Sequence, residues 1–300
     1  MDMLRTITAV MALAMPVVTN AAVVEGTARI SGGPNTLDLQ YSDNTGPVSI
    51  NESSSINGPG TTGTTLGLVS VTGSDNGFFT LSEFGQGTHE NESRFQFTEV
   101  ITNTAATDQL FSMDFLINAG QLRTTVYETV PQAGEFLEAG YGISISFGGA
   151  TLFESGALLR QEGGPGDFDT FATLSQSGTS LGGVLTNPQT GAPDTFLYSW
   201  DAFAGSLELG LLAAGASGIL EYDIVTFGSG IFASCGSGCG ATQASIGDPL
   251  NVSSIGGPDS ITSAPPVAPV PEPEIYAMML SGIGIMGWVA RRRKRKHAAV

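Results

Sequence analysis

A serine, a histidine and an aspartate are the residues whose types and spacing could do nucleophilic chemistry. Ser180 is the central residue of Gly178 to Gly182, which has the Gly-x-Ser-x-Gly spacing of a nucleophile elbow. Such an elbow requires a strand-to-helix turn in a mostly parallel sheet and a histidine base. His89 is the one histidine before the C-terminal tail, and Asp194 would complete a triad. Because His89 lies far upstream and no central segment has a helical apolar period, we expect no catalytic residues.

Acidic loops supply the candidate metal ligands. Asp75 lies in a Ser-Asp-Asn-Gly segment, and Asp167 and Asp169 lie in a Gly-Asp-Phe-Asp segment. Carboxylate oxygens are the ligands that calcium prefers, but neither segment has the full twelve-residue calcium loop. Asp and Asn before Gly are also ordinary turn formers. We therefore expect no cofactor, and calcium is the candidate ion for these two segments.

A second acidic segment surrounds His89. Together with Glu90 and Glu92 this histidine offers a metal site, although a solvated polar loop over residues 86–92 is the favoured interpretation. A glycoside hydrolase needs two carboxyl groups about 5–10 Å apart. The chain has 28 acidic residues, so the sequence alone does not select such a pair.

Two cysteines, Cys235 and Cys239, lie in a Ser-Cys-Gly-Ser-Gly-Cys-Gly segment. In an oxidising compartment we expect them to form a small disulfide loop. Closing so short a loop removes little entropy from the unfolded chain, so its effect should be local.

The C-terminal segment is organised in three parts. Val270 to Glu274 reads Val-Pro-Glu-Pro-Glu, an apolar run follows over 275–290, and six consecutive cations occupy 291–296. As a helix the apolar run would be roughly 24 Å long, which is short for a hydrocarbon core of about 30 Å. The cations resist crossing and stay on the cytoplasmic side. We expect a short transmembrane helix over 275–290, held in the inner membrane, with the preceding chain outside.

This order of parts resembles the PEP-CTERM sorting signal. The resemblance covers about Val270 to Lys296 and implies a Gram-negative bacterium that makes exopolysaccharide. It also implies recognition by an exosortase, a membrane-embedded protease that is thought to cut near the Pro-Glu-Pro motif. The residues that match are, for the motif, Pro271, Glu272 and Pro273, and, for the membrane stop, Arg291, Arg292, Arg293, Lys294, Arg295 and Lys296.

The N-terminus and the charge distribution agree with export. Residues 6–18 are largely apolar and small residues follow, which is typical of a signal peptide over 1–21. The whole chain carries a net charge of −17, and most of its cations lie in the C-terminal tail. The acidic region between the two signals lacks the cations that neutralise phosphates, which excludes nucleic acid as a partner.

Short segments with strand-like alternation fill the region between the signals. Tyr141 to Phe147 places Ile143, Ile145 and Phe147 on one face, and Leu122 to Val130 alternates in the same way. Period-2 alternation is typical of half-buried strands. Many such strands separated by turns predict an all-β fold, an antiparallel β-sandwich or a jelly-roll-like domain, as one large domain or two small ones.

The predicted organisation has four parts: a signal peptide at 1–21, an exported β domain at 22–246, a Ser/Gly/Pro-rich linker at 247–269 and the sorting signal at 270–296. We expect a non-enzymatic surface or matrix protein with a structural or adhesive role, with exopolysaccharide as a partner besides the exosortase. The alternative is a carbohydrate-binding protein or carbohydrate-active enzyme on a β-sandwich scaffold.

Overall fold

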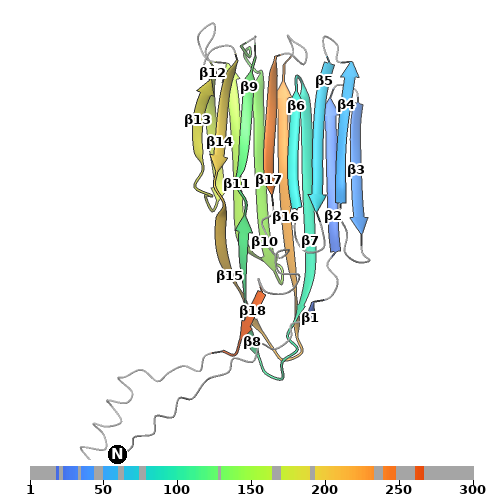
Figure 1. Cartoon of the computed structure of the whole chain (residues 1–300), viewed down its shortest axis with the longest axis vertical. Coiled ribbons are helices and arrows are strands. Elements are labelled where there is room, and N and C mark those ends of the chain that lie inside the picture. Colours follow the sequence, from blue (N-terminus) through green and yellow to red (C-terminus); the bar gives the residue numbers. More distant parts are fainter. Residues whose placement is uncertain are drawn as a thin grey trace, which may run out of the picture. The chain divides into compact units, whose positions relative to one another are not determined.

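The computed structural model divides into two compact units, Met1–Ala264 and Pro265–Val300. It describes residues 18–19, 23–32, 35–43, 50–59, 64–73, 79–127, 130–163, 170–189, 193–232, 239–247 and 261–266. All the described strands belong to the first unit, which is drawn in Figure 1. The described residues contain no helix, so the prediction of an all-β fold is confirmed.

Two large antiparallel sheets form this unit, and we call them sheets A and B. Sheet A has the order β12 (Thr170–Gly178), β11 (Ala150–Gly163), β10 (Phe136–Phe147), β16 (Ser217–Ile231), β7 (His89–Thr102), β2 (Val23–Gly32) and β3 (Asn35–Asp43), and β1 (Val18–Thr19) pairs with the end of β7. Sheet B has the order β13 (Val184–Gln189), β14 (Asp194–Trp200), β9 (Gly120–Val126), β17 (Gly240–Gly247), β6 (Phe79–Gln86), β5 (Thr64–Gly73) and β4 (Ile50–Pro59).

A third, smaller sheet C continues the unit at one end. Its order is β15 (Phe203–Leu212), β8 (Gln109–Ile117) and β18 (Ile261–Ala264). The ring of Phe115 on β8 meets Phe153 of β11 edge-on, with 4.9 Å between the ring centroids. Sheet C therefore shares the apolar core of the large sheets.

Sheets A and B pack face to face through the alternate residues of their strands. In β7 the residues Phe95 and Phe97 are buried, and in β16 Tyr222 and Ile224 are buried. Phe79 of β6 stacks on Phe95 across the two sheets at a centroid distance of 4.8 Å. Period-2 alternation places one face of each strand in this core and leaves the other face to solvent.

The chain passes from one large sheet to the other at both lateral edges. The connection from β3 to β4 joins the sheets at one edge, and the connection from β12 to β13 joins them at the other (Figure 1). Each large sheet therefore ends in strands that pair on one side only among the described residues.

The predicted polar loop over 86–92 is wrong. The segment is a tight turn from β6 of sheet B to β7 of sheet A, in which only Gly87 and Thr88 separate the strands and Gly87 has a φ of 71°. The side chains of β7 alternate between the core and solvent from His89 onward. The segment looked like a loop because its inward-facing residues are polar rather than apolar.

The linker, the signal peptide and the C-terminal helix that the sequence predicts are covered by the described residues only in part or not at all. Strand β18 lies within the range 247–269 predicted as a linker. A strand forms there because Ile261 is buried against the core beside Met113 of β8. The predicted signal peptide overlaps the described residues only at Val18–Thr19, and the predicted helix over 275–290 lies outside them. Among the residues that the structure describes, none belongs to a helix long and apolar enough to cross a membrane.

Candidate functional site

Most of the site residues predicted from the sequence lie outside the described part of the chain. These are the calcium candidates Asp75, Asp167 and Asp169, the motif residues Pro271, Glu272 and Pro273, the basic residues 291–296, and Cys235. The predictions for them stay predictions. In the described part of the chain, no group of three or more His, Cys, Asp or Glu side chains is arranged to hold a metal ion.

Cys239 is the predicted disulfide cysteine that the structure describes. Its side chain is disulfide-bonded and fully buried, and it packs in a small apolar cluster with Val126, Leu137 and Phe232. The backbone carbonyl of Cys239 accepts a hydrogen bond from Tyr127 N at 2.9 Å. The cysteine therefore ties the start of β17 to the end of β9.

The three residues of a conceivable triad lie apart. Ser180 is exposed in the loop between β12 and β13, so a strand rather than a helix follows it. Strand β12 is four positions from β7 in sheet A, so at the usual strand spacing the two strands lie roughly 19 Å apart. Asp194 is buried at the start of β14 and accepts a hydrogen bond from Asn187 at 3.1 Å.

His89 instead belongs to a buried set of polar side chains between the two large sheets. His89 Nδ1 lies 2.9 Å from Gly87 O, and His89 Nε2 lies 2.7 Å from Thr242 Oγ1. Thr242 Oγ1 lies 3.4 Å from Glu83 Oε2. We call this set the polar core cluster, and its members are Glu83, His89, Asn91, Ser93, Thr226 and Thr242, all buried.

Burial decides the protonation of the polar core cluster. It raises the pKa of Glu83 to about 8, against opposing hydrogen bonds from Asn91, Thr242 and the backbone of Ala244. It lowers the pKa of His89 to about 4. At neutral pH the carboxyl of Glu83 is therefore protonated and the imidazole is neutral.

These protonation states give a consistent direction of hydrogen bonding. His89 Nδ1 donates to Gly87 O, so Nε2 is the acceptor and must receive a hydrogen from the Thr242 hydroxyl. That hydroxyl has one hydrogen, so it cannot donate to His89 and to Glu83 Oε2, 3.4 Å away, at the same time. The cluster is a structural network, since Glu83 and His89 are only 1% and 4% exposed.

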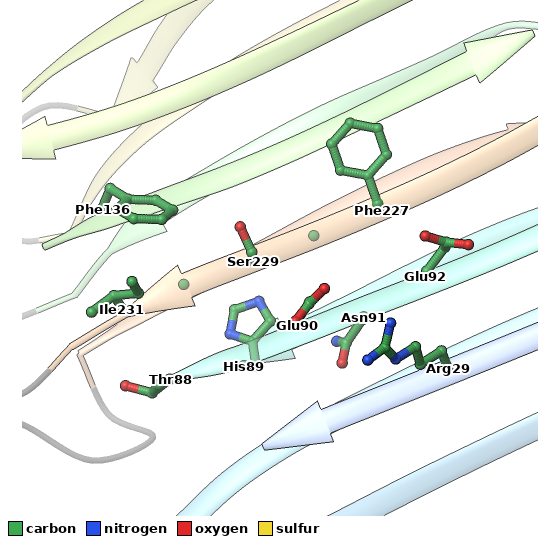
Figure 2. A pocket seen from close by; sticks show the side chains of 12 residues that line it. Arg29, Thr88, His89, Glu90, Asn91, Glu92, Phe136, Phe227, Ser229 and Ile231 are labelled. Atoms are coloured by element: carbon green, nitrogen blue, oxygen red, sulfur yellow. The ribbon is translucent and has the colours of Figure 1, made fainter. Parts of the chain in front are cut away.

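The outer face of sheet A, which points away from the core, carries a surface hollow. We call it the aromatic hollow, and Figure 2 shows the rings of Phe136 and Phe227 on β10 and β16 with Glu90 and Glu92 on β7. Its volume is about 600 Å³. Its other side chains include Arg29, which lies opposite Glu92 in the register of β2 and β7.

A glycine shapes the aromatic hollow. Gly140 is the residue opposite Phe227, and a Cβ at Gly140 would lie 2.3 Å from the tip of the Phe227 ring. The ring therefore lies across the neighbouring strand, where any side chain would displace it. This placement presents a face of the aromatic ring on the sheet surface.

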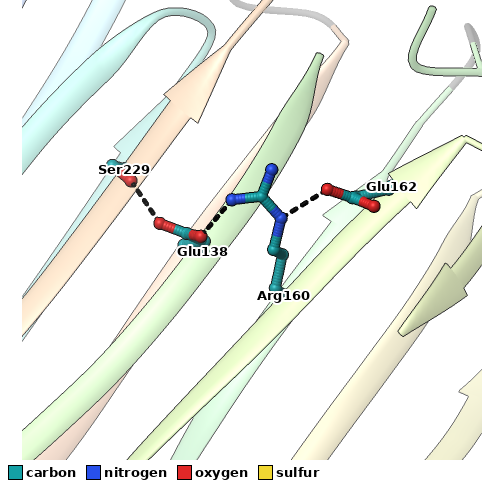
Figure 3. Close-up of polar contacts among 4 residues, drawn as sticks. All are labelled: Glu138, Arg160, Glu162 and Ser229. Carbon is teal, nitrogen blue, oxygen red and sulfur yellow. Dashed lines mark hydrogen bonds and ion pairs between the residues drawn. The ribbon is translucent and has the colours of Figure 1, made fainter. Parts of the chain in front are cut away.

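A chain of charged side chains holds Phe136 at the other end of the hollow. Arg160 of β11 lies 4.0 Å above the centroid of the Phe136 ring and pairs with both Glu138 and Glu162 (Figure 3). Ser229 donates to the second oxygen of Glu138 at 3.3 Å. Arg160 therefore makes a cation–π contact with Phe136 while two carboxylates fix its guanidinium.

A second hollow lies on the same face of sheet A. We call it the carboxylate hollow; its volume is about 510 Å³, and its lining includes Glu25, Glu221 and Asp223. Asp223 accepts two hydrogen bonds from Arg94, one of them from Nε at 2.7 Å. The outer face of sheet A is thus hollowed twice and carries most of its charge in paired or clustered acids.

The sequence contained a signal for this face that the strand predictions did not use. In β7 the residues Glu90, Glu92 and Arg94 alternate with the uncharged His89 and Asn91. Charged residues at every second position indicate one solvent-facing side even where the opposite side is polar.

The comparisons with known proteins concern the other end of the chain. A family model for the PEP-CTERM protein-sorting motif matches residues 269–294. The chain carries a PEP-CTERM sorting motif. No curated protein matches the chain in sequence.

The PEP-CTERM motif determines the route of the protein rather than its activity. It indicates export and membrane-anchored sorting, and it implies recognition by an exosortase, a membrane protease. The matched range includes Pro271 to Pro273 and the first four residues of the basic run. The β domain with its hollowed outer face precedes the PEP-CTERM motif in the chain.

Proposed function

We propose that the protein is a non-enzymatic cell-surface or matrix protein of a Gram-negative bacterium, with an adhesive or structural role in its exopolysaccharide or biofilm. An exosortase processes it during sorting, and the domain is then retained at the surface or released. The PEP-CTERM motif supports the route. The aromatic hollow is the single observation that supports the role.

The shape and lining of the aromatic hollow fit a sugar chain. Ligand sites are concave, typically of about 300–1,000 Å³, with aromatic walls and a few placed polar groups. Here Phe136 and Phe227 supply ring faces, and Ser229, Glu90 and Glu92 supply polar groups. The chain carries a net charge of −17, which repels anionic polymers, so the proposed ligand is a neutral polysaccharide.

One observation favours a second candidate, a carbohydrate-active enzyme. Glu90 and Glu92 both line the aromatic hollow and lie two residues apart on one face of β7. Such residues are about 7 Å apart along a strand, which is within the range of about 5–9.5 Å for the carboxyl pairs of glycoside hydrolases.

A binding experiment with the full-length protein tests the proposal. The protein in mild detergent is passed over the immobilised polysaccharide of its own organism, and the Phe227→Ala variant is compared with Phe84→Ala. Phe84 faces outward on sheet B and is the matched control. We expect Phe227→Ala to weaken retention by about tenfold, or ~1.4 kcal/mol, because it removes a stacking surface, and Phe84→Ala to leave it unchanged.

The same experiment distinguishes the two candidates. Failure of the wild-type protein to bind the polysaccharide would contradict the proposed role. Release of shorter sugars from the polymer, abolished in Glu90→Gln or Glu92→Gln, would establish the enzyme instead.

A further inference from the structure

The edge of the domain formed by β12 and β13 is uncharged. No Asp, Glu, Lys or Arg occurs from Thr170 to Pro193, a range that contains both strands and the loop between them. The chain as a whole carries a net charge of −17. Two copies of the chain therefore repel one another overall, and the repulsion is weakest where uncharged segments meet.

The same edge is open for pairing. Strand β12 ends sheet A and β13 ends sheet B, and in the described part of the chain each pairs with a neighbour on one side only. A strand at a sheet edge presents a row of unpaired N–H and C=O groups to any other strand. Phe171 on β12 and Val184 on β13 are also 43% and 61% exposed, which adds apolar surface to the edge.

Strand β12 lacks the features that usually prevent edge pairing. Natural edge strands carry charges, prolines, bulges or are very short. Strand β12 is nine residues long, contains no proline or charge, and pairs with β11 in an uninterrupted register from Thr170 to Gly178. Strand β13, in contrast, contains Pro188 and an irregular register between Thr186 and Gln189.

The opposite edge of the domain differs in charge. Strand β3 contains Asp38 and Asp43, and β4 contains Glu52. Acids at an edge repel a second acidic chain, which is one of the ways in which edge strands avoid association. The β12 edge is therefore the less acidic of the two lateral edges, and the one that a second copy can approach with less repulsion.

We infer that β12 is a self-association edge, where it pairs antiparallel with β12 of a second copy and extends sheet A across the two chains. Antiparallel pairing of a strand with its own copy is isologous, so a two-fold axis relates the two chains and closes the assembly as a dimer. The axis lies perpendicular to the sheet, so the outer faces of both copies of sheet A point the same way. Strand β12 of a second copy carries no charged residue, so it can pair at this edge without an oppositely charged residue to neutralise it.

Mass measurement of the full-length protein in mild detergent tests the inference. Thr173→Lys places a cation on the exposed side of β12, where two copies would bring the like charges together. Thr151→Lys is the matched control, because Thr151 is also exposed but lies on β11, outside the segment of β11 that pairs with β12. We expect the wild type and Thr151→Lys to be dimers and Thr173→Lys to be a monomer with an unchanged circular dichroism spectrum.

A cysteine scan makes the test independent of the folding of one variant. Single cysteines at positions 172–176, oxidised at low protein concentration, should form a disulfide dimer most readily at the residue nearest the two-fold axis. Similar crosslinking at all positions, or none, would overturn antiparallel pairing. A monomeric wild type, a dimer that persists in Thr173→Lys, or open-ended assembly would each overturn the inference as well; the last would mean that β12 pairs with a different edge.

Discussion

The carboxyl group of Glu83 lies between the two large sheets, where its ionisation would place a charge in the core. Glu83 Oε1 has no hydrogen-bond partner among the described residues, and the side chain lies over Gly228, where a Cβ would come within 2.3 Å of it. The protonated form is neutral and tolerates this environment, whereas the carboxylate does not. Burial also raises the pKa of Glu99 to about 7.

The stability of the domain should fall as the pH rises. Above pH 4.5 the unfolded chain loses the proton of Glu83, while the folded chain keeps it until about pH 8. Glu99 adds to this loss up to about pH 7, and His89 opposes it between about pH 4 and 6.5. From pH 7 to 8 Glu83 contributes most of the decline among these three, about 1 kcal/mol over this interval.

The Glu83→Gln variant tests this dependence. Its free energy of unfolding, measured with urea at a series of pH values, should lose the decline between pH 7 and 8. Glu83→Asp is the control, because it keeps an ionisable carboxyl at the same place and should keep the decline. A wild-type protein that becomes more stable between pH 7 and 8 would contradict the assigned protonation of the polar core cluster.

At the scale of single elements, the apolar strands were predictable and the polar start of β7 was not. Strand β10 was predicted from Tyr141 to Phe147 because its inward positions are large and apolar. Strand β7 begins with inward His89, Asn91 and Ser93, each of which forms a hydrogen bond to another strand, as Ser93 does with Thr226 at 2.8 Å. A hydrophobic pattern cannot detect a face that is buried by such long-range pairing.

The aromatic hollow could not be predicted for a related reason. Phe136 and Phe227 are 91 positions apart, and only the register of β10 with β16 brings them to one face. The contact of Phe227 with Gly140 likewise depends on pairing between distant segments. The sequence predicted most of the strands but not which strands pair with each other. Without the pairing, it could not predict which side chains meet on the surface of a sheet.

Strand β18 provides a prediction at the scale of one element. Ile261 is 5% exposed and packs in the core, whereas Ser263 on the same strand is exposed. We expect Ile261→Ala to cost about 2–4 kcal/mol and to lower the thermal midpoint of the full-length protein by several degrees. Ser263→Ala should leave the midpoint within about one degree. Equal effects of the two substitutions would show that β18 does not dock on β8.

At the scale of the whole molecule, the delivery signal and the delivered domain are chemically distinct. The matched PEP-CTERM motif spans residues 269–294, after the last described strand, and six of the eleven Lys and Arg residues follow Val270. The β domain is acidic and supplies two hollows on one face of sheet A. A dimer through β12 would place two aromatic hollows on the same side, so that a polysaccharide bound by both would dissociate more slowly.

Two changes in the PEP-CTERM region should have opposite effects on the fate of the protein. Deletion of residues 270–300 leaves β18 intact and removes the apolar run and the basic residues, so the domain should appear in the soluble exported fraction without a membrane-bound stage. The combined Pro271→Ala, Glu272→Ala and Pro273→Ala substitutions keep the apolar run and the six cations, which resist crossing the membrane. This variant should accumulate in the membrane fraction as the uncut chain.

The measurement is fractionation and immunoblotting over time in an exosortase-bearing host, with the same host lacking the exosortase as control. If the triple variant were processed at the wild-type rate, the Pro-Glu-Pro residues would not be the recognition element, and if the deleted chain stayed membrane-bound, residues 270–300 would not be the anchor.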